Sequence, residues 1–144
     1  METEIHQLNL ITPLYCIPDK TPDPFDCGAI KGSGSVPGEE SIFCFELDED
    51  LFFNFEPDKN RFLEHLVFGG KAAASGGKGR TEIPGGNYLF AQKREFLGKE
   101  DIINLAVEIQ MEGLWQRLKP GKNIYLRYLY EDDSWVTQLF RPYF

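Results

Sequence analysis

The side chains best suited to chemistry in this sequence are aromatic. The 144 residues include 12 Phe, 6 Tyr and 2 Trp. Aromatic walls with a few polar groups are typical of small-molecule pockets, and their π faces also attract cations. The alternative is a sheet that is covered on both sides by ordinary core packing. We expect a ligand cleft lined by Tyr88, Trp115, Tyr125, Tyr128 and Trp135.

A phosphate-binding loop is not supported by the glycine-rich stretch in the middle of the chain. Lys78 follows Gly77, but Ala72 stands where the nucleotide-binding pattern needs its first glycine. Gly79 stands where that pattern needs Ser or Thr to hold magnesium. We therefore expect a flexible surface loop and no nucleotide cofactor.

Metal chemistry and thiol chemistry also lack their patterns. The chain has only two histidines, His6 and His65, and no HExxH motif. Cys16, Cys27 and Cys44 form no CxxC pair, and their odd number argues against a disulfide framework. We expect incidental or buried thiols, no metal site and no cofactor.

The charge is distributed unevenly. The net charge is −8, which argues against general binding to nucleic-acid phosphates. Residues 1–60 carry 3 basic and 13 acidic groups, whereas residues 61–144 carry 12 basic and 10 acidic groups. The acidic part could engage a basic protein partner. Six basic side chains cluster between residues 71 and 99, and they could form a solvated face or a patch for an anion. They are Lys71, Lys78, Arg80, Lys93, Arg94 and Lys99.

The first half of the chain predicts strands, a long loop and a short helix. Residues 5–17 are apolar and β-branched, and we expect a strand interrupted near Pro13. Residues 18–40 are rich in Pro and Gly and predict a loop. Residues 41–47 and 51–55 predict a hairpin.

A helix is expected next, with Asp58 as its N-cap. Its apolar face would hold Phe62, Leu63, Leu66 and Val67, and Gly69-Gly70 would end it. Residues 69–79 contain five glycines and predict a mobile segment.

The second half predicts a strand, a helix and two further strands. The strand falls within 81–92 and the helix within 99–118. Strands at 122–130 and 135–143 follow. The apolar stripe of the helix is expected to be Ile103, Val107, Met111, Leu114 and Leu118. The order predicts an α+β fold with a mainly antiparallel sheet and two helices.

This second half resembles the GyrI-like small-molecule-binding domains, which also serve as effector-binding domains of transcription regulators. The run from Ile83 to Phe90, IPGGNYLF, is similar to the family's IPAGKYAVF strand entry. The helix 99–118, Tyr128 and the closing strand 136–142 are similar to later parts of the family pattern. The resemblance covers residues 80–143.

The resemblance implies two pseudo-symmetric β-α-β-β modules around a cleft that binds amphipathic or cationic compounds. The acidic residue of the family's FExY strand is absent, because Leu126 and Arg127 occupy that region. Glu108 or Glu112 of the helix could take its place. We expect one domain over 1–144, with an acidic loop-rich module at 1–70 and a β-α-β-β module at 80–144.

The function expected from these features is binding of a small amphipathic or aromatic ligand by a stand-alone domain. One alternative is a protein-interaction module that uses the acidic half, as an inhibitor or a nucleic-acid mimic. Another is a small hydrolase that uses a Glu and a Tyr for acid–base chemistry. The acidic start of the chain and the lack of a long apolar run predict a cytoplasmic protein with no membrane contact.

Overall fold

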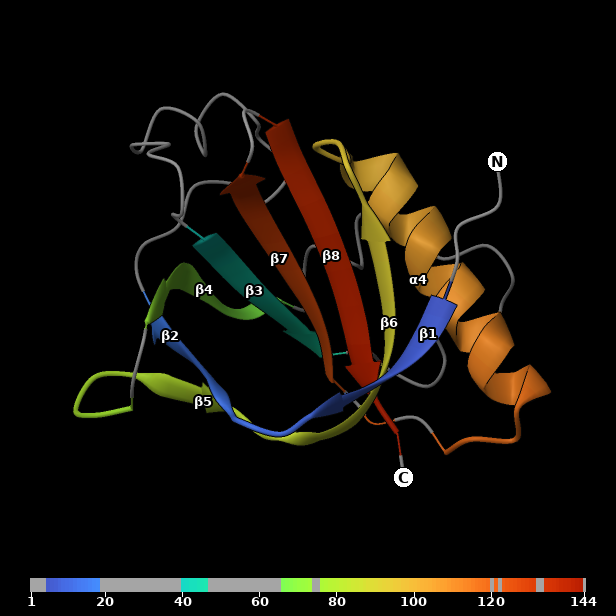
Figure 1. Cartoon of the computed structure of the whole chain (residues 1–144), viewed down its shortest axis with the longest axis horizontal. Helices are drawn as coiled ribbons and strands as arrows, with labels where there is room; N and C mark the ends of the chain where they lie inside the picture. Colours follow the sequence, from blue (N-terminus) through green and yellow to red (C-terminus); the bar gives the residue numbers. More distant parts are fainter. Residues whose placement is uncertain are drawn as a thin grey trace.

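The computed structural model describes residues 5–18, 40–46, 66–73, 76–119, 121, 123–131 and 134–143. Within these residues the fold is a mainly antiparallel sheet with one helix, and the expected α+β class is confirmed at that level (Figure 1). The elements are β1 (Ile5–Leu10), β2 (Leu14–Pro18), β3 (Glu40–Glu46), β4 (Leu66–Ala73), β5 (Thr81–Ile83), β6 (Gly86–Lys93), α4 (Lys99–Trp115), β7 (Asn123–Glu131) and β8 (Ser134–Pro142).

The eight strands form one sheet that closes on itself. Their order is β1-β6-β8-β7-β3-β4-β2-β5. β1 and β2 are two parts of one bent path along the chain, and so are β5 and β6. β1 pairs with β6 and β2 pairs with β5, while the other edge of β2 pairs with β4. The two ends of this strand order therefore meet, and the strands enclose an interior.

The bend in these two paths depends on small and rigid residues. β1 ends before the predicted interruption at Pro13, where a proline cannot donate to a ladder. Opposite it, a Cβ on Gly85 would stand 2.8 Å from the carbonyl oxygen of Leu10. Gly86 has a φ of 141°, which other residues rarely adopt. The glycines thus let the second path cross closely over the first.

Side chains of alternate residues build a core on each face of the sheet. In β7, Leu126 and Tyr128 pack toward α4, whereas Tyr125 packs into the interior, because successive side chains of a strand point to opposite faces. The interior cluster draws on six strands, and its buried members are Cys16, Ile42, Cys44, Ile83, Tyr88, Tyr125 and Phe140.

Helix α4 covers the outer face, but its buried stripe differs from the predicted one. Ile103 is buried as expected, whereas Met111 and Leu114 are exposed. The side chains that pack on the sheet are instead Ile102, Leu105, Ala106 and Ile109. Gly113 extends this stripe, since a Cβ there would lie 3.3 Å from Leu89 of β6. The small Ala106 and Gly113 allow a close approach that the larger residues of the predicted stripe would prevent.

The prediction of a helix that ends at Gly69-Gly70 is wrong for the residues that the structure describes. Leu66, Val67 and both glycines lie in β4, where Gly69 pairs with Phe43 and Gly70 with Ile42. The predicted mobile segment is likewise wrong over 69–73. Long-range pairing with β3 decides the conformation here, and the local glycine signal does not. The expected strand 51–55, the helix start at Asp58 and nearly all of the loop 18–40 lie outside the described residues.

No helix in the described part of the chain combines the length and the apolar character needed to cross a membrane.

The close approach at Gly85 makes a prediction about stability. We expect Gly85→Ala to lower the free energy of unfolding by about 2 kcal/mol, because the new methyl group meets a backbone oxygen that cannot rotate away. Gly98→Ala is the matched control, since a Cβ at Gly98 meets nothing within 4 Å. Gly98 is the N-cap of α4, with a φ of −81° that alanine also adopts, so the cost should stay below about 1 kcal/mol. Urea unfolding measures both, and equal midpoints for the two variants would show that the crossing is not tight.

Candidate functional site

The five aromatic residues expected to line one cleft lie in three places. Tyr88 and Tyr125 come together in the interior of the sheet. Tyr128 and Trp135 lie on the opposite face, toward α4. Trp115 lies at the end of α4 and is largely exposed. The structure therefore joins two of the five and places the other three elsewhere.

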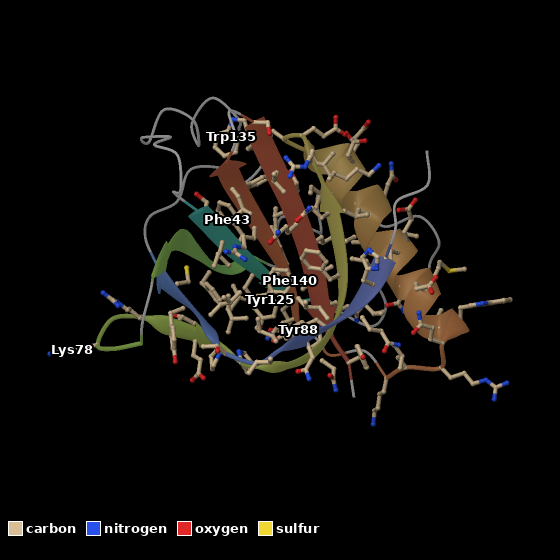
Figure 2. The ribbon with its side chains drawn as sticks, in the orientation of Figure 1. Phe43, Lys78, Tyr88, Tyr125, Trp135 and Phe140 are labelled. Atoms are coloured by element: carbon tan, nitrogen blue, oxygen red, sulfur yellow. The ribbon has the colours of Figure 1, made fainter. Side chains whose placement is uncertain are left out.

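The two interior tyrosines form an aromatic cluster with Phe140, on the adjacent strands β6, β8 and β7. The Tyr88 ring meets Tyr125 and Phe140 edge-on, at centroid distances of 6.1 and 5.5 Å. Tyr125 and Phe140 stack at 5.4 Å. Figure 2 shows the three rings together in the hollow of the curved sheet. Such pairs fix the ring positions beyond what burial alone provides.

The phenol groups of this cluster are held by short-range polar partners. The Tyr88 hydroxyl donates to the carbonyl oxygen of Pro84 at 2.5 Å. Burial raises the pKa of Tyr88 to about 12, and the nearby Tyr125 and Cys44 contribute. Burial also raises the pKa of Tyr125. A hydrogen bond with the Asn123 side chain lowers this pKa in part, but the effect of burial is larger. Both phenols are therefore neutral at physiological pH.

The two described cysteines add no reactive thiolate to this interior. Burial is the main cause that raises the pKa of Cys16 to about 11 and that of Cys44 to about 12. A thiol needs a lowered pKa to act as a nucleophile near neutral pH. Cys16 and Cys44 therefore serve as small apolar core residues, as the sequence predicted for its thiols.

A pocket of about 610 Å³ opens beside the tyrosines. It lies where β6 begins, β7 begins and β8 ends, and this volume lies in the range of small-molecule sites. Backbone hydrogen bonds fix its frame, from Gly121 N–H to Pro142 at 2.8 Å and from Tyr143 N–H to Asn87 at 3.1 Å. The lining residues are Pro84, Gly85, Gly86, Asn87, Tyr88, Gly121, Asn123, Tyr125, Pro142 and Tyr143.

The lining of this pocket, as far as the structure describes it, holds no charged side chain. Its polar groups are the amides of Asn87 and Asn123 and the phenols of the tyrosines. Glu46 faces the same side of the sheet as its partner Asn123, but it is not a lining residue. The arrangement suits a ligand whose body is apolar and uncharged.

A buried arginine supports the pocket from the outer face. Arg141 follows Phe140 on β8, and its Nε donates to the carbonyl oxygen of Gly121 at 3.0 Å. Its Nη1 donates to the side chain of Gln110 on α4. Burial lowers the pKa of Arg141 to about 10. These bonds join the helix to the segment that carries Gly121 at the pocket wall.

Tyr128 and Trp135 position the segment that leads into α4. Phe96 stacks on Tyr128 at 4.2 Å and meets Trp135 edge-on at 5.5 Å. The Tyr128 hydroxyl donates to the Leu97 carbonyl at 2.9 Å. Thr137 accepts from the Leu97 N–H at 3.1 Å. These contacts explain the aromatic residues through packing of the helix and not through a ligand.

The two glutamates proposed as acidic partners lie on α4, away from the tyrosines. Glu108 is exposed and borders a smaller pocket of about 190 Å³ together with Asp101 and Lys93. Glu112 accepts a hydrogen bond from Gln116 at 2.7 Å. Neither glutamate lines the tyrosine pocket.

The sequence patterns did not predict several of the residues that line the pocket. Asn87, Asn123 and Tyr143 stand at strand ends, where the alternation of side chains no longer predicts a direction. The run Pro84-Gly85 could have indicated the pocket, because Pro and Gly beside a strand often mark a place where a ligand or another backbone approaches closely. No group of three or more His, Cys, Asp or Glu side chains suited to a metal ion occurs among the described residues.

No protein-family model matches the chain, and no curated protein matches it in sequence.

The buried phenol of Tyr88 predicts a dependence of stability on high pH. Its pKa is about 10 when unfolded and about 12 when folded, so the folded state binds the proton more tightly. The stability that it contributes is complete below pH 10 and is lost as pH rises toward 12. We expect the free energy of unfolding to fall more steeply between pH 10 and 12 in the wild type than in Tyr88→Phe.

Arg141, whose lowered pKa acts in the opposite direction, is present in both proteins, so its effect cancels in that comparison. Urea unfolding at several pH values provides the measurement. Parallel curves for the wild type and Tyr88→Phe would show that Tyr88 titrates as an ordinary exposed phenol.

Proposed function

We propose that this protein binds a small aromatic or amphipathic ligand, with an uncharged body, in the pocket beside Tyr88 and Tyr125. The observation that carries the proposal is the uncharged, aromatic lining of a cavity of about 610 Å³. Tyrosine and proline walls are rigid, so they lose little conformational entropy when a ligand binds. The asparagine amides supply the few polar groups that would orient the ligand.

The closed sheet supports this proposal because it preforms the pocket. Tyr88 is 1% exposed and Tyr125 is 3% exposed, so their rings are already fixed by core packing. Pro84 is held in turn by the Tyr88 hydroxyl. A ligand would therefore meet walls that need no ordering.

We also propose, from the resemblance, that the second half of the chain is related to GyrI-like domains. The order β6, α4, β7, β8 is one β-α-β-β run, which is the part of the chain that carries the resemblance. A second, pseudo-symmetric module remains a prediction, as does a cytoplasmic location. The family's preference for cations is not favoured here, because the described lining holds no acidic side chain.

The two alternative functions have weaker support. A hydrolase that uses Glu and Tyr would need a carboxylate beside a pocket tyrosine, and Glu108 and Glu112 line no part of the pocket. A protein-interaction module built on the acidic half remains a prediction, because most of residues 1–60 lie outside the described residues.

Ligand binding can be tested with N-phenyl-1-naphthylamine, a neutral aromatic probe whose fluorescence rises in apolar sites. We expect saturable binding by the wild type. Tyr143→Ala should raise the Kd about tenfold, which corresponds to about 1.4 kcal/mol, because it removes one aromatic wall.

Two controls separate the pocket from other effects. Tyr15→Ala removes another half-buried tyrosine that does not line the pocket, and Glu46→Gln removes the nearby charge. Both should bind the probe with the wild-type Kd. A folded wild type that shows no saturable binding would contradict the proposal, as would equal affinities of Tyr143→Ala and Tyr15→Ala.

A further inference from the structure

The two tyrosines of the pocket use their hydroxyl groups in different ways. The Tyr88 hydroxyl gives its hydrogen to the carbonyl oxygen of Pro84. Burial raises the pKa of Tyr125, and a hydrogen bond with the Asn123 side chain lowers that pKa in part. A hydrogen bond stabilises a phenolate only when the partner is the donor, so the amide N–H of Asn123 donates to the Tyr125 oxygen. Tyr88 is therefore a donor within the protein, whereas Tyr125 is an acceptor.

The hydrogen of the Tyr125 hydroxyl points away from Asn123. A phenol has one hydrogen to donate, and this hydrogen cannot lie on the side from which the oxygen accepts. Tyr125 and Asn123 both line the pocket, so their hydrogen bond places the phenol end of Tyr125 at the pocket wall. The pocket is thus the space in which this hydrogen can meet an acceptor.

Core packing holds this donor in place before any ligand arrives. Phe140 stacks on the Tyr125 ring at 5.4 Å, and Tyr88 meets the same ring edge-on at 6.1 Å. Rings packed in this way do not change rotamer freely, because protein cores are close-packed. A donor whose position is fixed in advance loses little entropy when it meets its acceptor.

The surroundings of this donor favour an acceptor without charge. An anion that leaves water needs a cation beside it, and the described lining of the pocket holds no charged side chain. The buried Arg141 does not line the pocket, and its guanidinium donates to Gly121 and to Gln110 of α4. A ketone, ester or amide oxygen needs no counter-charge, so it fits this wall where a carboxylate does not.

We propose that the ligand of this pocket carries a neutral carbonyl oxygen on its aromatic body, and that the Tyr125 hydroxyl donates the hydrogen bond that selects it. This inference rests on the proposed binding function and adds the class of ligand to it. That class is aromatic ketones, esters and amides, in preference to aromatic hydrocarbons of the same shape and to aromatic carboxylates.

Three naphthalenes with the same ring system test this selection, each by displacement of N-phenyl-1-naphthylamine. They are 2-acetylnaphthalene, 2-ethylnaphthalene and 2-naphthoate. Tyr125→Phe removes the donor and keeps the ring. It should raise the Kd of 2-acetylnaphthalene about tenfold and that of 2-ethylnaphthalene by less than about twofold. The wild type should bind 2-naphthoate at least about tenfold more weakly than 2-acetylnaphthalene.

Tyr15→Phe is the matched control, because it removes a phenol hydroxyl from a tyrosine that does not line the pocket. It should leave the Kd of all three compounds unchanged. A second measurement serves if Tyr125→Phe does not fold. The carbonyl stretch of isotope-labelled 2-acetylnaphthalene should lie at a lower frequency in the wild-type complex than in hexane, because a hydrogen bond weakens the C=O bond.

The outcomes separate this inference from the binding function on which it rests. Equal effects of Tyr125→Phe on the ketone and on the hydrocarbon would overturn the class of ligand and leave the binding function standing. An unshifted carbonyl stretch, or tighter binding of 2-naphthoate than of the ketone, would do the same. A folded wild type that binds none of the probes saturably would overturn both.

Discussion

The carbonyl of Leu10 lies so close to Gly85 that no side chain fits between the two backbones. This crossing lets the paths β1–β2 and β5–β6 bend together and stay paired on both sides of the bend. Closure follows, since β2 can then reach β4 while β1 remains with β6. The pocket depends on the same place, because Pro84, Gly85 and Gly86 form part of its wall.

Closure also determines the chemistry of the interior. A sheet that encloses its inner face buries Tyr88, Tyr125, Cys16 and Cys44, and burial raises the pKa of each of their acidic groups. The cluster around these four residues is therefore neutral and apolar. The one strongly buried cation of the described structure, Arg141, lies on the outer face and bonds to α4 and Gly121. A neutral interior cluster and a preformed pocket are two consequences of one topology.

Local sequence patterns predicted what depends on neighbours along the chain. The strand β7, the break at Pro13 and the position of α4 are of this kind. Pairing between distant segments could not be predicted, so Gly69-Gly70 indicated a helix end although β3 holds both residues in a strand. The sequence of α4 also allowed two apolar stripes to face the sheet, the predicted one through Met111 and the observed one through Ile109. The observed stripe includes Gly113, whose small size matters only because Leu89 of β6 lies opposite it. The aromatic cleft was predicted from composition, which carries no information about which face each ring occupies.

Closure of the sheet requires that β2 has a paired strand on each side. Nuclear Overhauser effects from Tyr15 measure this directly, because Tyr15 pairs with Glu82 of β5 on one side and with Ala73 of β4 on the other. In a closed sheet we expect cross-strand contacts from the Tyr15 backbone to both residues, together with slow amide exchange along β2. Contacts to only one of the two, with rapid exchange of alternate β2 amides, would instead show an open sheet.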